Sequence, residues 1–295
     1  MAVPSVAQRA LERKVDSLFV IASSAELKSR DQVEPAKDSI AALGVDVVPV
    51  LVGKFTTKSA RERMTIIQIF KRIGSPAVPY LVRSLNLADG LVVQRVCWAL
   101  GDIGDTAAVL PLKQVSTHPR WQVRDECLGA LGDIGDPRAA DAVLAGFSDE
   151  AGQVRKAAVV AAGKVGLARA IPGLVAMLAD DFYGARLSAV EALLQLDTAV
   201  VVATLGDSLH SRRKLVGNLA CHVLGRIATD HAIELLYAEA HATDPGRRAH
   251  ALVALVAADP HDNCGFRDSL MAGETDSAVI RKVQSAVYTA RNETR

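Results

Sequence analysis

The chain has 295 residues, of which 50% are hydrophobic but only 4% aromatic, so its apolar content is mainly Ala, Val, Leu and Ile. Its 34 basic and 33 acidic residues leave a net charge of +1, which provides no general attraction to nucleic acid or to an anionic membrane. The longest apolar run, residues 251–258, is far shorter than the roughly 18 residues of a membrane span. The N-terminal residues also lack the layout of a secretory signal. We therefore predict a cytoplasmic protein without a membrane partner, and nucleic acid is not the expected partner.

Three parts are predicted in chain order. Residues 1–34 form an N-terminal capping helix, because the segment 5–27 is amphipathic over its whole length. Residues 35–258 form a repeat array, and residues 259–295 form C-terminal capping helices that include 277–290. Terminal repeats need one polar face, which both caps provide.

The array is marked by an apolar stretch that recurs every 30 or 31 residues and ends at an anchor residue. The anchors are Gly44, Gly74, Gly104, Gly135, Gly166, Asp197 and Ala228. A fixed period in this range is typical of stacked helical repeats, whose usual product is a long binding surface. Because glycine readily takes the left-handed conformation with which helices end, we predict that each anchor is a helix C-cap.

Each repeat is predicted to contain two helices. Before the anchor, apolar residues at helical spacing, such as Val154, Ala158 and Ala162 before Gly166, give one buried stripe. After the anchor, a proline starts a second, shorter helix, where its missing amide has no helical partner. These prolines are Pro49, Pro79, Pro111 and Pro172. The expected class is therefore all-α.

Two neighbouring repeats carry a family resemblance. Asp149-Glu150 followed by Val154-Arg155 and Gly163-Lys164-Val165-Gly166, and Val123-Arg124 followed by Leu131-Gly132-Asp133-Ile134-Gly135, resemble the HEAT-like repeats of the phycobilisome-lyase type. The resemblance covers residues 35 to 258. It implies a right-handed α-solenoid with an ARM-like fold, in which the long helices line the concave side.

The resemblance also implies a structural ladder, in which a turn Asp and a long-helix Arg connect successive repeats. Asp149 with Arg155, and Asp180 with Arg186, match this pattern. Arg63 and Arg124 hold the arginine position without an acid six residues earlier. Val93 and Gly217 replace the arginine in two further repeats, where we expect weaker stacking.

The outward stripe of the long helices is the predicted partner-binding surface. It contains two rows, six and two residues before each anchor, together with nearby charged and aromatic residues. The candidates are Gln68, Arg72, Arg95, Trp98, Asp102, Trp121, Glu126, Asp133, Lys164, Glu191, His222 and Arg226. Trp98 beside Arg95 is a pairing enriched at interface centres. Alternatively, the Trp98 indole folds over the small neighbour Gly129 and only fills the groove.

Catalytic motifs are missing from the sequence. None of the seven histidines is followed by Glu, as in the iron-binding His-Glu pairs of deoxyhypusine hydroxylases, and there is no Gly-x-Ser-x-Gly, phosphate loop or His-Glu-x-x-His. His261 and Cys264 lack the paired spacing of a zinc site. We therefore expect no catalytic residue, no metal and no cofactor.

Two functions remain open from the sequence. The first is a non-catalytic scaffold or assembly factor that binds another protein on the concave face. The second, implied by the resemblance, is a bilin lyase or chaperone subunit that acts on a phycobiliprotein. A fold alone does not decide between them.

Overall fold

The computed structural model describes residues 5–26, 30–259, 269 and 271–293. Its contacts divide the chain into two compact units, residues 1–165 (unit 1) and 166–295 (unit 2). All regular secondary structure in the described residues is helical, which confirms the all-α prediction.

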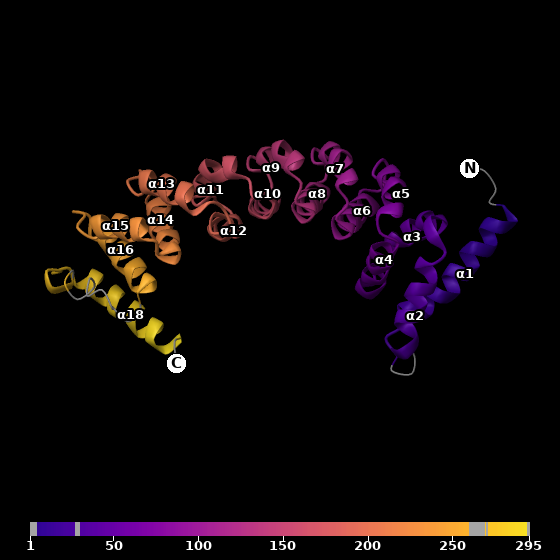
Figure 1. The fold of residues 1–295 in the computed structure, drawn as a ribbon, viewed down its shortest axis with the longest axis horizontal. Helices are drawn as coiled ribbons and strands as arrows, with labels where there is room; N and C mark the ends of the chain where they lie inside the picture. The colour runs from indigo at the N-terminus through magenta and orange to yellow at the C-terminus, as the bar shows by residue number, and fades with distance from the viewer. Residues whose placement is uncertain (1–4, 27–29, 260–268, 270, 294–295) are drawn as a thin grey trace. The chain divides into compact units, whose positions relative to one another are not determined.

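Unit 1 is a stack of helix pairs. From α3 to α10, short helices alternate with helices of 14 residues. In Figure 1 the long helices α6, α8 and α10 lie side by side in one layer, and α5, α7 and α9 form the other layer. The bounds are α1 Val6–Ala22, α2 Arg30–Ala41, α3 Val48–Gly53, α4 Ala60–Ile73, α5 Val78–Ser84, α6 Gly90–Ile103, α7 Val109–Val115, α8 Trp121–Ile134, α9 Ala140–Gly146 and α10 Gly152–Val165.

Unit 2 continues the helix pairs within its own boundaries. Its helices α12, α14 and α16 contact one another in sequence order, and α18 packs on α16. The bounds are α11 Ile171–Met177, α12 Tyr183–Leu193, α13 Thr198–Ser208, α14 Lys214–Ile227, α15 Asp230–Glu239, α16 Pro245–Ala258 and α18 Ser277–Glu293.

The glycine anchors end long helices, as predicted. Gly104 and Gly135 have φ values of 74° and 71° in the left-handed region, and Ala228 adopts the same region with φ 52°. The prediction is wrong for Asp197, which has φ −55° and caps the N-terminus of α13. Its carboxylate accepts hydrogen bonds from the amides of Ala199 and Val200, so α12 ends earlier, at Leu193.

Glycines inside the long helices allow close packing between repeats. A Cβ atom added at Gly101 would lie 2.8 Å from the Ala130 Cα atom, and one at Gly132 would lie 2.8 Å from the Ala161 Cα atom. Real side chains do not approach a backbone this closely, so larger residues at these positions require helices α6, α8 and α10 to move apart. These glycines therefore let neighbouring long helices of unit 1 pack closely.

The predicted apolar stripe of the long helices is buried. Val154, Ala158 and Ala162 are buried, and Leu128 and Val159, seven residues before their anchors, are buried as well. Cys97, Cys127 and Cys221 are buried free thiols, whereas His261 and Cys264 lie outside the described residues.

One predicted boundary of the repeat array falls inside a helix, and the other coincides with a helix end. The boundary between residues 34 and 35 falls inside α2, which has Pro35 in its interior. The C-terminal boundary follows the end of α16 at Ala258. Among the described residues no single helix is both long and apolar enough to cross a membrane. The pair formed by α2 and residues 44–56, which is bent by 109° at the break between them, would pass on length and composition alone.

Candidate functional site

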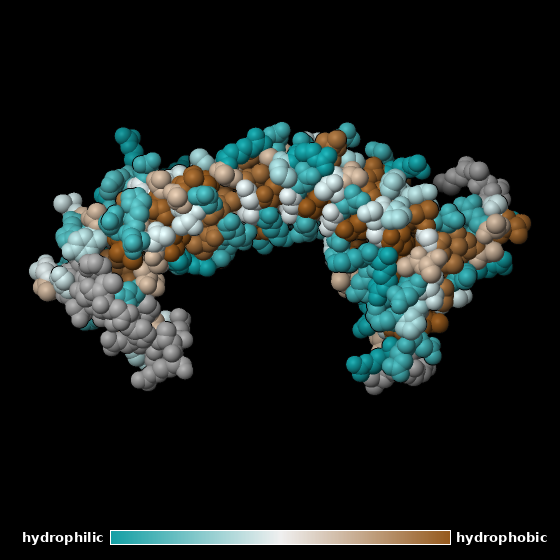
Figure 2. All heavy atoms as spheres, viewed as in Figure 1, coloured by the Kyte–Doolittle hydropathy of each residue, from teal (hydrophilic) through white to brown (hydrophobic). Residues whose placement is uncertain are grey.

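The candidate protein-binding surface in unit 1 is the long-helix face, which we define as the outward side of α4, α6, α8 and α10. Its central row contains Gln68, Trp98, Gly129 and Val160, one residue from each helix, and all four are half-buried. Figure 2 shows hydrophilic residues over α8 and α10 at this edge of unit 1, with hydrophobic residues between the two helix layers. The face therefore has an uncharged central row within a polar surface.

Trp98 is half-buried rather than fully exposed, in contrast to the expectation of an exposed side chain. A Cβ atom built at Gly129 would meet no atom within 4 Å, so the Trp98 indole does not cover Gly129. One turn before Trp98, the side-chain amide of Gln94 donates to the Glu126 Oε2 atom at 3.4 Å. The Gly129 position on α8, which is equivalent to Trp98 on α6, is therefore open.

Arg95 is fixed by a contact that the sequence did not reveal. Its Nη1 atom donates to the main-chain oxygen of Thr57 at 2.8 Å. Burial, followed by the nearby charge of Arg63, lowers the pKa of the Arg95 guanidinium. Arg95 thus bridges α6 to the turn before α4 while it borders Trp98.

Glu126 is a half-buried carboxylate without an ion pair among the described residues. Burial is the main cause that raises its pKa, and the charges of Asp125 and Asp133 act in the same direction. Burial likewise raises the pKa of Asp125, although the nearby charge of Lys156 acts in the opposite direction. At both carboxyls burial outweighs the contact that favours the ionised form, which is the Gln94 hydrogen bond at Glu126 and the Lys156 charge at Asp125.

The charged row two residues before the anchors consists largely of ion pairs between adjacent repeats. Lys71, which precedes the row residue Arg72, lies 3.3 Å from Asp102. Lys164 lies 2.5 Å from Asp133. Arg72 pairs with Glu34 and, at 2.8 Å, with Asp38 on α2. The charged residues of this row in unit 1 are therefore paired within unit 1.

The remaining candidates lie at other places. In unit 2, Arg226 pairs with Glu191, and its hydrogen bond lowers the pKa of that carboxyl. His222 is exposed on α14. Trp121 is the first residue of α8 and is 38% exposed, so it lies at the helix end and not in the central row.

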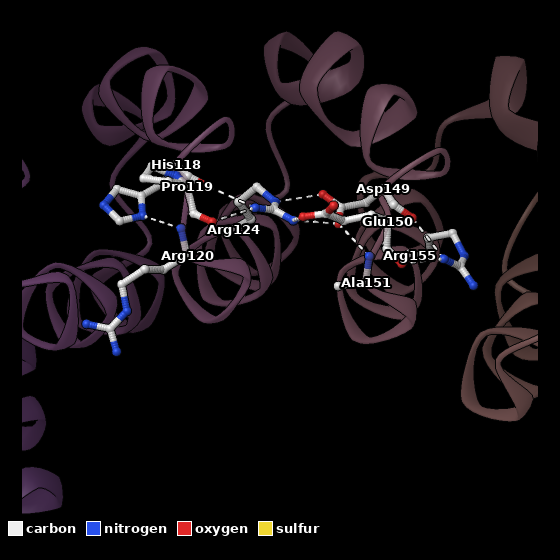
Figure 3. Close-up of polar contacts among 8 residues, drawn as sticks. All are labelled: His118, Pro119, Arg120, Arg124, Asp149, Glu150, Ala151 and Arg155. Carbon is white, nitrogen blue, oxygen red and sulfur yellow. Dashed lines mark hydrogen bonds and ion pairs between the residues drawn. The ribbon is translucent and has the colours of Figure 1, made fainter.

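The ladder is centred on Arg124 (Figure 3). Its Nε and Nη2 atoms donate to the two carboxylate oxygens of Asp149 at 2.7 and 2.8 Å. Its Nη1 atom donates to the main-chain oxygens of His118 and Pro119 at 3.0 and 3.2 Å. The side chains of Arg124 and Asp149 are only 10% and 12% exposed, and the Asp149 hydrogen bond raises the pKa of Arg124. Arg124 therefore joins two successive turns.

Three other ladder arginines contact main-chain oxygens of the turn that precedes their own helix. Arg155 donates to the main-chain oxygen of Asp149 at 2.8 Å, and Arg186 donates to that of Asp180 at 2.6 Å. Arg63 similarly donates to the main-chain oxygen of Lys58 at 2.9 Å. Because any residue supplies this oxygen, Arg124 needs no acid in its own turn, and its carboxylate partner belongs to the next repeat.

Arg248 in unit 2 makes the same set of contacts as Arg124, and the sequence analysis did not identify it. In unit 2, Arg248 donates from Nε and Nη2 to the Glu274 carboxylate at 2.8 and 3.1 Å and from Nη1 to the oxygens of Ala242 and Thr243. The contact lowers the pKa of Glu274 to about 2. The 31-residue period, continued from Ala228, reaches Asp259 and places Arg248 in the arginine position. The repeat period could therefore have identified Arg248 as a ladder residue.

No group of three or more His, Cys, Asp or Glu side chains in the described part of the chain is arranged to hold a metal ion. The long-helix face carries one indole, hydrogen-bonding side chains and compensated charges.

Comparison with known proteins gives the class. Residues 109–194 match a family model described as HEAT repeats. The Escherichia coli protein YIBA is a similar solved structure, with 15% identity, a TM-score of 0.51, and coverage of 88% of this chain and 98% of that one. The complex of CpcE and CpcF of phycocyanin lyase from Nostoc sp. has 20% identity, a TM-score of 0.42, and coverage of 81% and 94%.

A designed armadillo repeat protein in complex with the peptide (KR)4 has 18% identity and a TM-score of 0.41, and the alignment covers 62% of this chain and 99% of that one. No curated protein sequence matches the chain. The fold defines an α-helical repeat protein, and its residues 109–194 are similar to HEAT repeats.

Proposed function

We propose that this helical-repeat protein is a non-catalytic scaffold and that the long-helix face of unit 1 binds a protein partner, with Trp98 at its centre. The observation that carries the proposal is the half-buried Trp98 in a central row whose next position, Gly129 on α8, has no atom within 4 Å of an added Cβ. A partner that spans both helices would contact the indole and α8 together. A partly desolvated aromatic residue is the kind of anchor that dominates binding energy.

The surroundings of Trp98 support the proposal. Arg95, Gln94 and Glu126 form hydrogen bonds between repeats, so their geometry exists before a partner arrives. Preorganised side chains lose less conformational entropy on binding. The ion pairs Lys71–Asp102 and Asp133–Lys164 border the central row, which is typical of an apolar centre with a polar rim.

Site-specific photo-crosslinking tests the proposal. A photoreactive amino acid is introduced at Gln68 or at Val160 on the long-helix face, and at Leu110 on α7 as the matched control, because Leu110 is 57% exposed on the other helix layer. The protein is illuminated in an extract of its source cells. We expect the same protein to be crosslinked from positions 68 and 160 and not from 110. Equal crosslinking from all three positions would contradict the proposal.

A further inference from the structure

Unit 2 contains a cavity of ≈ 400 Å³ that the proposed function does not use. It lies between the first turns of α14 and α16 and is closed on one side by the turn that precedes α14. Leu209 and Cys221, both buried, give it an apolar wall. A volume of this size is within the range of small-molecule sites.

The cavity lies where the ladder is interrupted. Gly217 occupies the arginine position of α14 and lines the cavity. In unit 1 the corresponding Arg124 side chain covers the carbonyl oxygens of the preceding turn. An arginine does not fit at position 217 in the present packing, because a Cβ atom at Gly217 would lie 2.8 Å from the Leu209 oxygen. The junction is thus left without the side chain that fills it elsewhere.

The carboxylates that line the cavity are already satisfied. Glu239, whose side chain is 3% exposed, accepts hydrogen bonds from Nε and, at 2.7 Å, Nη2 of Arg247. Asp244 accepts the main-chain amide of Arg247 at 2.9 Å and caps α16. Neither carboxylate therefore needs an additional cation.

The uncompensated charge of the cavity is positive. Arg212 lines it and makes no ion pair within the part of the chain that the structure describes. Lys214 also lines it, is 87% exposed, and approaches Asp244 only to 3.7 Å. Asn218 adds a neutral hydrogen-bonding group on the same side of α14. A guanidinium and an ammonium close to an apolar wall suit a ligand with an anionic head and an apolar body.

We propose that this cavity binds a small organic phosphate. The phosphate group contacts Arg212 and Lys214, and the organic part packs against Leu209 and Cys221. Phosphate fits this arrangement because a guanidinium can hold two of its oxygens while the ammonium contacts another.

Isothermal titration calorimetry of the full-length protein with phenyl phosphate tests the site. We expect phenyl phosphate to bind about tenfold more tightly than either inorganic phosphate or phenol, since each of these carries only half of the recognised chemistry. Arg212→Ala and Lys214→Ala should each weaken binding about fivefold or more. Arg213→Ala is the matched control, because Arg213 lies between them in the sequence but does not line the cavity.

Each result bears on the proposal. No binding of phenyl phosphate, or equal affinity for phenol, would overturn it. An Arg213→Ala effect as large as that of Arg212→Ala would show a diffuse charge effect and would also overturn it. If Arg212→Ala alters the helical circular dichroism, Arg212→Gln provides the same test, and unchanged affinity in a folded variant contradicts the assignment.

Discussion

Arg124 shows how one side chain can hold a repeat junction. Its three donor nitrogens contact a carboxylate and two main-chain oxygens, with little exposure to water. Arginine is suited to this because its planar fork matches the carboxylate while its remaining donors reach other acceptors. Sequence reasoning selected Arg124 and Asp149 as ladder residues but could not pair them, because the pairing depends on which turns the stacking brings together.

Replacement of Arg124 tests this role. We expect Arg124→Ala to lower the free energy of unfolding by about 2–3 kcal/mol, because Asp149 loses its cation while it stays mostly buried. Arg138→Ala is the control, since the Arg138 side chain is 52% exposed and pairs with Asp136 in its own turn. Urea unfolding monitored by circular dichroism measures both. Equal losses in the two variants would contradict the special role of Arg124.

Glu126 carries a prediction about pH. Burial raises the pKa of its carboxyl in the folded state above the ordinary value of a glutamate, so ionising this group costs more in the folded than in the unfolded protein. The ionised group therefore costs stability once the pH rises through the raised pKa, and the cost disappears below the unfolded value. Glu126→Gln should unfold at a higher temperature than wild type at pH 7 and at the same temperature near pH 4 or below.

The control for this experiment is Glu234→Gln, because the Glu234 side chain is 76% exposed. We expect no comparable gain at pH 7 from this variant. A melting temperature of Glu126→Gln that equals or falls below the wild-type value at pH 7 would contradict the predicted cost of ionising the half-buried Glu126 carboxyl.

At the scale of the helix, glycine determines both where a helix ends and how closely it packs. The sequence period located the long helices because Gly104, Gly135 and the other glycine anchors occupy left-handed positions. Asp197 occupies the same place in the period but caps the next helix instead, because its side chain can accept two amide hydrogen bonds. Periodicity alone does not distinguish these outcomes.

Two glycines of α8 give a matched test of packing. Gly132→Ala should destabilise the protein by about 1 kcal/mol or more, because its Cβ atom would meet the backbone of Ala161. Gly129→Ala should stabilise it by about 0.5–1 kcal/mol, because the added Cβ meets no neighbour and alanine favours a helix. Thermal or urea unfolding measures both changes. The same sign for both substitutions would contradict the close approach of α8 and α10.

The long-helix face could be predicted only in part. Helical spacing identified the central row and the charged row, because both follow from the repeat period. The burial of Trp98, the contact between Arg95 and Thr57, and the pairing of Lys164 with Asp133 depend on the distance and offset between adjacent helices. These quantities result from the packing of small residues and are not encoded by the period.

At the scale of the whole molecule, stacked repeats behave as a nearly one-dimensional array in which each repeat contacts mainly its neighbours. The division into two compact units agrees with this description. A substitution that weakens one junction between repeats should therefore destabilise mainly the helices at that junction. We expect Arg124→Ala to increase amide hydrogen exchange in α8 and α10 and to leave α14 and α16 of unit 2 unchanged. A uniform increase along the chain would show a single cooperative unit.

The most direct test of the account is the affinity of the photo-crosslinked partner, once identified, for wild-type protein and for two tryptophan variants. Trp98→Ala should weaken binding at least about tenfold, because Trp98 is placed at the centre of the long-helix face. Trp121→Ala should weaken it less than about threefold, because Trp121 lies at the end of α8. Circular dichroism checks that both variants keep their helical content. Unchanged affinity of Trp98→Ala, or a larger loss for Trp121→Ala, would contradict the assignment of the binding surface.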